Sequence, residues 1–430
     1  MPMKWLCATF VVLHFSAFTS CSSEVDDYFS EPASKRLANT MEKAAQILQS
    51  AEYGWEFEYY PGAALEYGGI IYIVKFDKQQ ATVGCSLIPD STYTSYYKLT
   101  NDNGPVLSFD TYNPLLHYFA TPSSEEYEAK GGDFEFVIDN ITDDVISLYG
   151  KKTRNTMFLR RLKTSPDGYA RKTVDVFDHF ADSIHGNIGT ATVHGKCNPV
   201  NRTISMSAGS STFSVHYAYT DRGIRLYRPL QIGGVSVQDF NYDTATSLLT
   251  CTDAEGVQLQ GTPYATDFMS YPLYEADYTL NYDNGPVDVH LKPNRLEGTY
   301  LLQGLSRKYD LVLHYDTATG NLLLGSQVVG QTDDGRVIYW ACYDYDGGGT
   351  ALADEGQFTI KWNKNRFYPR FDVKATNPNI LNCSGGLLIY LYTNADGNLT
   401  AGLIDEPAWL TNGSMQFRNI VSLNRKTRIQ

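Results

Sequence analysis

The sequence lacks a long hydrophobic run after its first twenty residues, and it lacks the short motifs that mark several large enzyme classes. A membrane-spanning helix needs about 20 consecutive apolar residues, so no span is expected in the body of the chain. The GxSxG nucleophile elbow, the phosphate-binding P-loop and the dinucleotide-binding GxGxxG pattern are all missing, so acyl transfer and nucleotide chemistry have no recognisable starting point. We therefore expect a protein that binds and does not catalyse.

Positive charge is also scarce. The chain has 35 Lys and Arg residues against 48 Asp and Glu residues, and a formal net charge of −13 at pH 7. Such a surface offers few cations to a phosphate backbone, so we expect no nucleic-acid partner. Hydrophobic residues make up 43% of the chain, which is typical of a folded globular protein and not of a disordered one.

The N-terminal segment has the organisation of a secretory leader. Lys4 precedes an apolar run from Trp5 to Phe18, which is too short to span a bilayer. The small residues before Cys21 resemble the lipobox of bacterial lipoproteins, in which the cysteine is acylated and begins the mature chain. The acidic stretch from Glu24 to Asp27 resembles the export signal of Bacteroidetes surface lipoproteins. We expect Cys21 to anchor the protein by lipid in the outer membrane, with its body exposed at the surface.

Close cysteine pairs are missing as well. Of the seven cysteines, one lies in the leader and Cys21 is the expected lipid site, which leaves five in the body. Five is an odd number, and no two of them have the CxxC spacing typical of zinc ribbons and redox sites. We expect buried thiols that pack as small hydrophobic side chains, at Cys85, Cys197, Cys251, Cys342 and Cys383.

The body contains many short apolar runs, separated by Gly, Pro, Asn and Asp. Such runs predict a mainly β protein made of antiparallel β-sandwich or barrel-like modules. An amphipathic pattern at the start of each of the first two modules predicts one helix there. The expected organisation is a signal peptide at 1–20, a polar tether at 21–33, a helix plus β module at 34–164, a second helix plus β module at 165–265, and a C-terminal β module at 266–430.

The second predicted helix has three marked positions. Ser165 is the expected N-cap, and Pro166 is expected at the first helical position, where its missing N–H costs nothing. Gly186 is the expected end of the helix.

Several longer motifs carry a family resemblance. They are Gly68-Gly69, the run from Gly104 to Phe119, the run from Gly131 to Ile138, and Leu148 to Lys152. In this order they resemble a Bacteroidetes family of lipoproteins with a domain of unknown function. The resemblance implies a nutrient-capture setting, because such proteins are often encoded beside SusC/SusD-like uptake systems, and it supplies no catalytic residue.

A glycine-rich acidic segment is the candidate metal site. Asp344, Asp346, Gly349 and Glu355 match positions 1, 3, 6 and 12 of an EF-hand calcium loop, which makes the three acids candidate calcium ligands. Position 5 is Gly348, where a ligand oxygen is expected, and the segment before the loop is predicted to be a strand. We prefer a glycine-rich turn with solvated acids, and we expect no cofactor.

Tyrosine is unusually abundant, with 32 residues. Its rigid ring with a polar tip suits both ligand binding and packing on a half-buried sheet. Tyr271, Tyr274 and Tyr278 lie among prolines and away from a clear strand pattern, which makes them candidate ligand-binding residues.

The acidic residues leave one catalytic alternative. Asp133, Glu135 and Asp139 alternate as the solvent face of a strand would. A pair of carboxylates could still converge only in the folded protein, as glycosidases require. The favoured hypothesis is a non-catalytic surface lipoprotein that binds a glycan, a peptide or a protein partner. The alternatives are a glycan- or peptide-acting hydrolase and an adhesive or structural lipoprotein.

Overall fold

The computed structural model describes residues 33–102, 104–122, 129–346, 349–351, 356–364, 369–375, 383–404, 406–411 and 414–429. The predicted signal peptide, Cys21 and most of the tether lie outside these residues. The described chain is mainly β with antiparallel pairing throughout its sheets, which confirms the predicted fold class. No helix in the described ranges is long and apolar enough to cross a membrane.

The N-terminal sheet has nine strands in the order β4-β3-β2-β1-β9-β8-β7-β6-β5, and helix α1 (Ala33–Gln49) packs on it. Trp55 begins the first strand and donates from its indole Nε1 to the carbonyl of Leu48 at 2.9 Å, which fixes the end of the helix on the sheet. The strands are β1 (Trp55–Tyr59), β2 (Ile70–Phe76), β3 (Gln80–Cys85), β4 (Ile88–Tyr96), β5 (Lys98–Asn101), β6 (Pro105–Ser108), β7 (Glu135–Ile141), β8 (Val145–Gly150) and β9 (Thr156–Arg161).

Helix α2 (Tyr169–Asp178) leads into the middle barrel, a closed barrel of eight consecutive strands. Its strands are β10 (Ser183–Ile188), β11 (Ala191–Asn198), β12 (Thr203–Ala208), β13 (Ser211–Tyr219), β14 (Gly223–Ile232), β15 (Val235–Asp243), β16 (Leu248–Cys251) and β17 (Gln258–Thr262).

The limits predicted for this helix are wrong. Gly168 is the N-cap, and Pro166 lies in the turn before it, where the hydroxyl of Ser165 accepts from the amide of Asp167 at 3.3 Å. The helix ends eight residues before Gly186, which lies within β10.

The C-terminal part forms a second closed barrel and a separate sheet, whereas the sequence predicted a single module. The C-terminal barrel contains η1 (Tyr271–Tyr274), β18 (Ala276–Asn281), β19 (Val287–Asn294), β20 (Thr299–Gln303), β21 (Leu311–Asp316), β22 (Asn321–Gly325), β26 (Gln357–Asn363), β27 (Arg370–Ala375) and β31 (Ser422–Arg425). The C-terminal sheet contains β23 (Gln327–Gln331), β24 (Val337–Asp344), β25 (Gly349–Ala351), β28 (Gly385–Thr393), β29 (Leu399–Leu403) and β30 (Gln416–Phe417), and η3 (Pro407–Trp409) follows β29.

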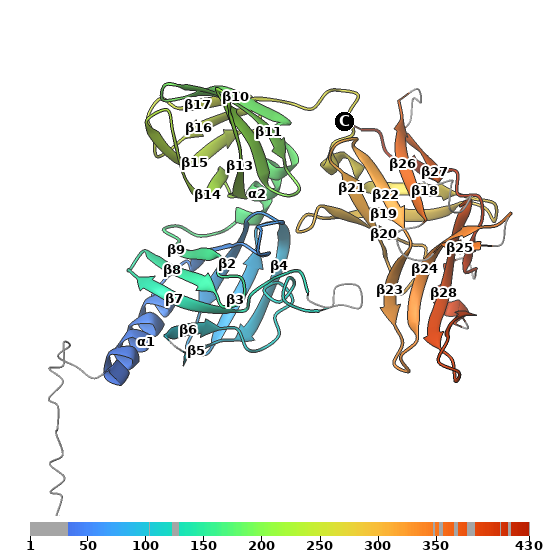
Figure 1. Cartoon of the computed structure of the whole chain (residues 1–430), viewed down its shortest axis with the longest axis horizontal. Coiled ribbons are helices and arrows are strands. Elements are labelled where there is room, and N and C mark those ends of the chain that lie inside the picture. Colours follow the sequence, from blue (N-terminus) through green and yellow to red (C-terminus); the bar gives the residue numbers. More distant parts are fainter. Residues whose placement is uncertain are drawn as a thin grey trace, which may run out of the picture.

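Figure 1 shows how the four parts are arranged. The middle barrel lies above the N-terminal sheet in this view, and the C-terminal barrel lies beside both of them with the C-terminal sheet below it. The two barrels and the N-terminal sheet share one large hydrophobic cluster, so their cores are continuous.

Candidate functional site

The candidate site is a cleft of about 830 Å³ between the N-terminal sheet and the C-terminal barrel. The end of the β3–β4 turn and the start of β4 supply one wall through Leu87, Ile88, Pro89 and Ser91. The outer face of the C-terminal barrel supplies the other wall through β19 to β22. Its volume lies within the range of about 300–1,000 Å³ that is typical of ligand pockets, and interfaces between domains are common places for such pockets.

The turn between β19 and β20, residues 295–298, holds the two walls at a fixed separation. Arg295 donates from Nη2 to Asp178 of α2 at 3.0 Å and to Glu275 at 3.1 Å. Glu297 accepts a hydrogen bond from the hydroxyl of Tyr118 and forms an ion pair with Lys130 at 3.2 Å. One four-residue turn of the C-terminal barrel is therefore bonded both to the helix before the middle barrel and to the N-terminal sheet.

Arg202, from the loop between β11 and β12, completes the junction and is fully buried. Its Nε donates to the carbonyl of Tyr67 at 2.7 Å, and its two terminal nitrogens donate to the carbonyls of Arg295 at 3.0 Å and Leu296 at 2.9 Å. Burial lowers the pKa of Arg202. The middle barrel thus contributes one side chain that binds main-chain groups of both neighbouring parts.

The chemistry of the cleft is mixed. Leu301 and Val312 form an apolar strip on the barrel side, and Ile88 lines the opposite wall. Lys292 is exposed beside this strip, and its side chain has no hydrogen bond or ion pair with any described residue. Thr299 is 5% exposed at the base of the cleft, and its hydroxyl has no hydrogen-bond partner in the described chain.

Both carboxylates that line the cleft are ion-paired. Glu275 contacts Arg295, and Glu297 contacts Lys130 and Tyr118. A carboxyl group that donates a proton must be stabilised in its neutral form. A neighbouring cation stabilises the charged form instead, so neither Glu275 nor Glu297 is suited to donate a proton to a ligand.

A second pair of acids lies on β1, against the middle barrel. Arg225 donates from Nη1 to Glu56 and, at 2.8 Å, to Glu58, while the hydroxyl of Tyr169 donates to Glu56 at 2.7 Å. Burial raises the pKa of Glu58, which is 1% exposed. These carboxylates are closed to substrate and join the N-terminal sheet to the barrel. The sequence showed no sign of this, because Glu56 and Glu58 occupy the alternate positions of an ordinary half-exposed strand.

Asp133 is buried, which corrects the prediction that it lies on a solvent face. Its carboxylate accepts hydrogen bonds from the amide of Lys152 at 2.5 Å and from the amide of Thr153 at 3.2 Å. It therefore fixes the turn between β8 and β9.

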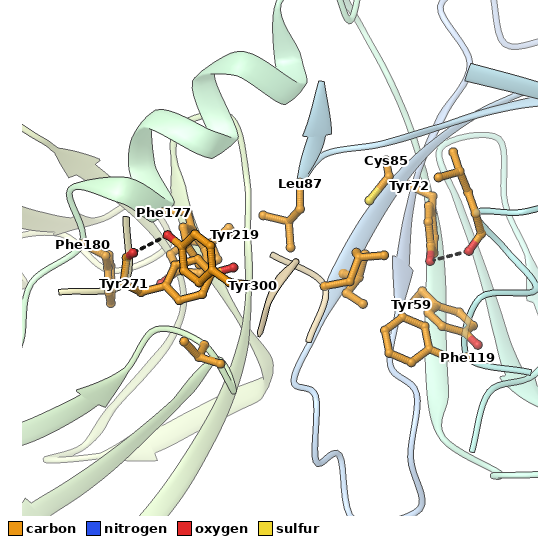
Figure 2. Close-up of a cluster of buried hydrophobic side chains, with 14 of the residues drawn as sticks. Tyr59, Tyr72, Cys85, Leu87, Phe119, Phe177, Phe180, Tyr219, Tyr271 and Tyr300 are labelled. Atoms are coloured by element: carbon orange, nitrogen blue, oxygen red, sulfur yellow. Dashed lines mark hydrogen bonds between the residues drawn. The ribbon is translucent and has the colours of Figure 1, made fainter. Parts of the chain in front are cut away.

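The tyrosines predicted to bind a ligand are core residues. Tyr271, Tyr274 and Tyr278 are at most 1% exposed, so their rings cannot reach a ligand. Their hydroxyls donate to main-chain carbonyls at 2.7–2.8 Å, and Tyr271 packs against Phe177 of α2 with the ring centres 5.6 Å apart. Figure 2 shows Tyr271 beside Phe177, in the cluster that joins the two barrels. The prolines around these residues indicated a loop. Tyr271 and Tyr274 lie in η1, which is buried between two cores, whereas Tyr278 lies in β18, so the expected absence of a strand is wrong for Tyr278.

The proposed calcium ligands are only partly described. Asp344 is buried at the end of β24 and accepts from the amide of Asp346 at 3.0 Å, while Glu355 lies outside the described residues. Asp344 pairs with Gly349 in an antiparallel hairpin, so the flanking helices of an EF-hand are not present here. No cluster of three metal-binding side chains occurs in the described part of the chain.

Arg202 and the cleft were both missed by sequence reasoning. A lone arginine between two strands has no local signature, and the cleft walls come from residues about 200 positions apart. A partial signal existed in Gly68-Gly69. A Cβ on Gly68 would lie 2.5 Å from Cβ of Arg202, and one on Gly69 would lie 2.6 Å from Cβ of Ala218, so both glycines permit close approach of the middle barrel.

Two family models match the sequence. A family described as a domain of unknown function (DUF4302) matches residues 25–244, and a second domain of unknown function (DUF4987) matches residues 250–382. The first match ends just after β15 and the second begins within β16, so the boundary between them falls inside the middle barrel. No curated protein and no solved structure matches the chain.

Proposed function

The chain belongs to the DUF4302 family, and from this premise we propose that it is a non-catalytic protein that binds an extended peptide in the cleft between its N-terminal sheet and its C-terminal barrel. The observation that carries the proposal is a cleft whose walls are bonded together by the β19–β20 turn and whose apolar strip lies beside Lys292, an exposed cation with no side-chain partner among the described residues. A fixed cleft favours binding, because little conformational freedom is lost when the ligand enters.

The lining favours a peptide over a glycan. An apolar strip beside an unpaired cation, with paired charges of both signs around them, matches the alternation of apolar and polar groups along a peptide. Among the described residues that line the cleft, Tyr118 is the one Phe, Tyr or Trp, and its hydroxyl already binds Asn294 at 2.9 Å and Glu297. Stacking of a sugar ring therefore has little support at this site.

The state of the carboxylates supports a binding role over hydrolysis. Glu275 and Glu297 are held by cations within the cleft, and Glu56 and Glu58 are enclosed by the middle barrel. None of these four is placed to act as a general acid on a ligand in the cleft.

We propose further that a lipid on Cys21 holds the protein at the outer surface of the outer membrane, where it captures its ligand beside a SusC/SusD-like uptake system. The leader and the acidic residues after Cys21 support this setting. The polar tether between Cys21 and α1 would separate the cleft from the membrane.

The cleft is tested by selecting peptides from a random library on the whole chain and measuring their affinity for two variants. Leu301→Arg places a long charged side chain across the apolar strip, and we expect it to weaken binding about tenfold or more. Leu323→Arg is the matched control, because Leu323 faces outward on β22, two strands away from Leu301, and does not line the cleft. Equal affinity for both variants, or selected peptides that bind elsewhere, would overturn the proposal.

A further inference from the structure

A second surface of the N-terminal sheet carries a cluster of exposed aromatic rings that is separate from the cleft. Tyr112 is 64% exposed and Phe134 is 38% exposed, and His117 lies between them. The His117 ring stacks on Phe134 with centres 5.1 Å apart, and it lies 5.5 Å from the Tyr112 ring. None of the three residues lines the cleft, although the adjacent Tyr118 does.

The loop that carries Tyr112 and His117 is fixed by the side chain of Asn113, which is fully buried. Its Oδ1 accepts from the amides of Leu115 at 3.1 Å and Leu116 at 3.4 Å. Its Nδ2 donates to the carbonyl of Tyr93 at 3.3 Å and to the hydroxyl of Ser95 at 3.2 Å. The rings are therefore held in place before any ligand arrives, which reduces the entropic cost of binding. The apolar run from Leu115 to Ala120 has the composition of a strand, but the side chain of Asn113 binds its first amides and holds the backbone in a turn.

The same hydrogen bonds determine what the loop can offer to a ligand. Its amide groups already donate within the loop, at Asn113, Leu115, Leu116, His117, Tyr118, Ala120 and Thr121. An incoming peptide strand would find few free donors there. The loop instead presents ring faces, which suit a ligand with an apolar face and polar edges.

A hollow of about 270 Å³ adjoins the cluster at Phe134 and is lined by Glu135 and Lys151. Lys151 forms ion pairs with Glu135 at 3.2 Å and with Asp102 at 2.6 Å. The nearby Lys98 is paired with Asp110 at 2.7 Å. Because these charges compensate one another, the surface can bind hydroxyl groups without selecting a charged ligand.

We propose that Tyr112, His117 and Phe134 form a stacking surface for an uncharged sugar ring, with the ring's hydroxyl groups received by the hollow beside Phe134. A pyranose ring has an apolar face of C–H groups and an edge of hydroxyl groups, which matches a ring cluster beside a polar hollow. This sugar site is independent of the proposed peptide cleft, because the two use different residues.

The test is isothermal titration of the whole chain with uncharged oligosaccharides of glucose, mannose, xylose and N-acetylglucosamine. We expect at least one of them to bind, and we expect Tyr112→Ala and Phe134→Ala each to weaken that binding about tenfold. Tyr96→Ala is the matched control, because Tyr96 is 52% exposed on the same sheet but outside the cluster, and it should bind as the unaltered chain does.

The sugar site would be overturned if no oligosaccharide of the panel bound, or if the Tyr112→Ala, Phe134→Ala double variant kept full affinity. Both rings are exposed, so their removal should leave the circular dichroism spectrum and the unfolding temperature unchanged. Leu301→Arg should leave sugar binding unchanged, so failure of the sugar site and failure of the peptide cleft can be told apart.

Discussion

At the scale of single residues, Arg202 has the most consequential position. A buried guanidinium is costly unless its N–H groups are bonded, and Arg202 bonds three carbonyl oxygens that belong to two other parts of the chain. The bonds therefore link Tyr67, near β2, with the β19–β20 turn through a side chain of the middle barrel. One side chain therefore joins the N-terminal sheet, the middle barrel and the C-terminal barrel at a single place.

Arg202→Met should lower the free energy of unfolding by about 3 kcal/mol or more, because it leaves three buried carbonyl oxygens without a donor. Urea denaturation monitored by circular dichroism measures this. Arg171→Met is the control, since the Arg171 side chain is 72% exposed and its ion pair with Asp90 should contribute less than about 1 kcal/mol. Similar losses of unfolding free energy in the two variants would show that the buried hydrogen bonds of Arg202 stabilise the fold no more than a surface ion pair does.

The described cysteines illustrate what sequence reasoning can establish for a residue. All five are free and buried, which confirms the prediction of buried thiols. Burial raises the pKa of Cys85 and Cys197 to about 12, so these thiols are protonated and unreactive near neutral pH. Burial of a single apolar side chain depends on composition and local pattern, both of which are visible in a sequence.

The tyrosines show the opposite case. Local composition correctly indicated that Tyr271 lies outside the strands, but it did not indicate that the ring is buried in a shared core. Whether a loop faces solvent or another domain depends on contacts made by distant residues. Sequence pattern cannot supply those contacts.

At the scale of elements, the β19–β20 turn is the feature on which the cleft depends. Gly298 has a φ of +68°, and a Cβ there would lie 1.7 Å from Cγ1 of Val200 in the middle barrel. The turn therefore requires glycine both for its backbone conformation and for the approach of the neighbouring barrel.

Gly298→Ala should destabilise the protein more than Gly209→Ala by about 2 kcal/mol, because only the first substitution creates a clash as well as backbone strain. Gly209 has a similar φ of +59°, and a Cβ added there would have no atom within 4 Å, so it isolates the cost of the conformation. Thermal unfolding of the two variants makes the comparison, and equal shifts would contradict the proposed close packing.

The elements that were mispredicted share a physical cause. The apolar spacing after Asp178 fits a helix as well as a strand, and Ile184 was assigned to the helix although it belongs to β10. The segment from Leu115 to Ala120 has the composition of a strand, but the side chain of Asn113 binds its amides and produces a turn. In both cases a tertiary contact or a local side-chain bond overrode a pattern that two structures could satisfy.

At the scale of the whole molecule, the acidic chain combines a fixed cleft with a proposed lipid anchor. Cys21→Ala should release the protein from the membrane fraction into the soluble fraction, because no other lipid site is expected. Fractionation of cells that produce the variant, with Cys85→Ala as a control that keeps the anchor, tests this. If the Cys21→Ala variant stayed in the membrane fraction, Cys21 would not be the membrane anchor.

The fold class was predictable because strand patterns and turn residues are local, and the positions of the parts were not. The cleft arises where residues 87–91 meet residues 292–301, and nothing in either segment identifies the other. The acids of β1 and the arginine of β14 are equally remote in sequence, at positions 56, 58 and 225.

The most direct measurement is hydrogen–deuterium exchange of the whole chain with and without a peptide selected from the random library. The account predicts slower exchange in residues 87–91 and 325–327, on the two walls of the cleft, and no change around Tyr112 and Phe134. Slower exchange confined to any other part of the molecule, or no change on binding, would contradict the assignment of the cleft as the peptide site.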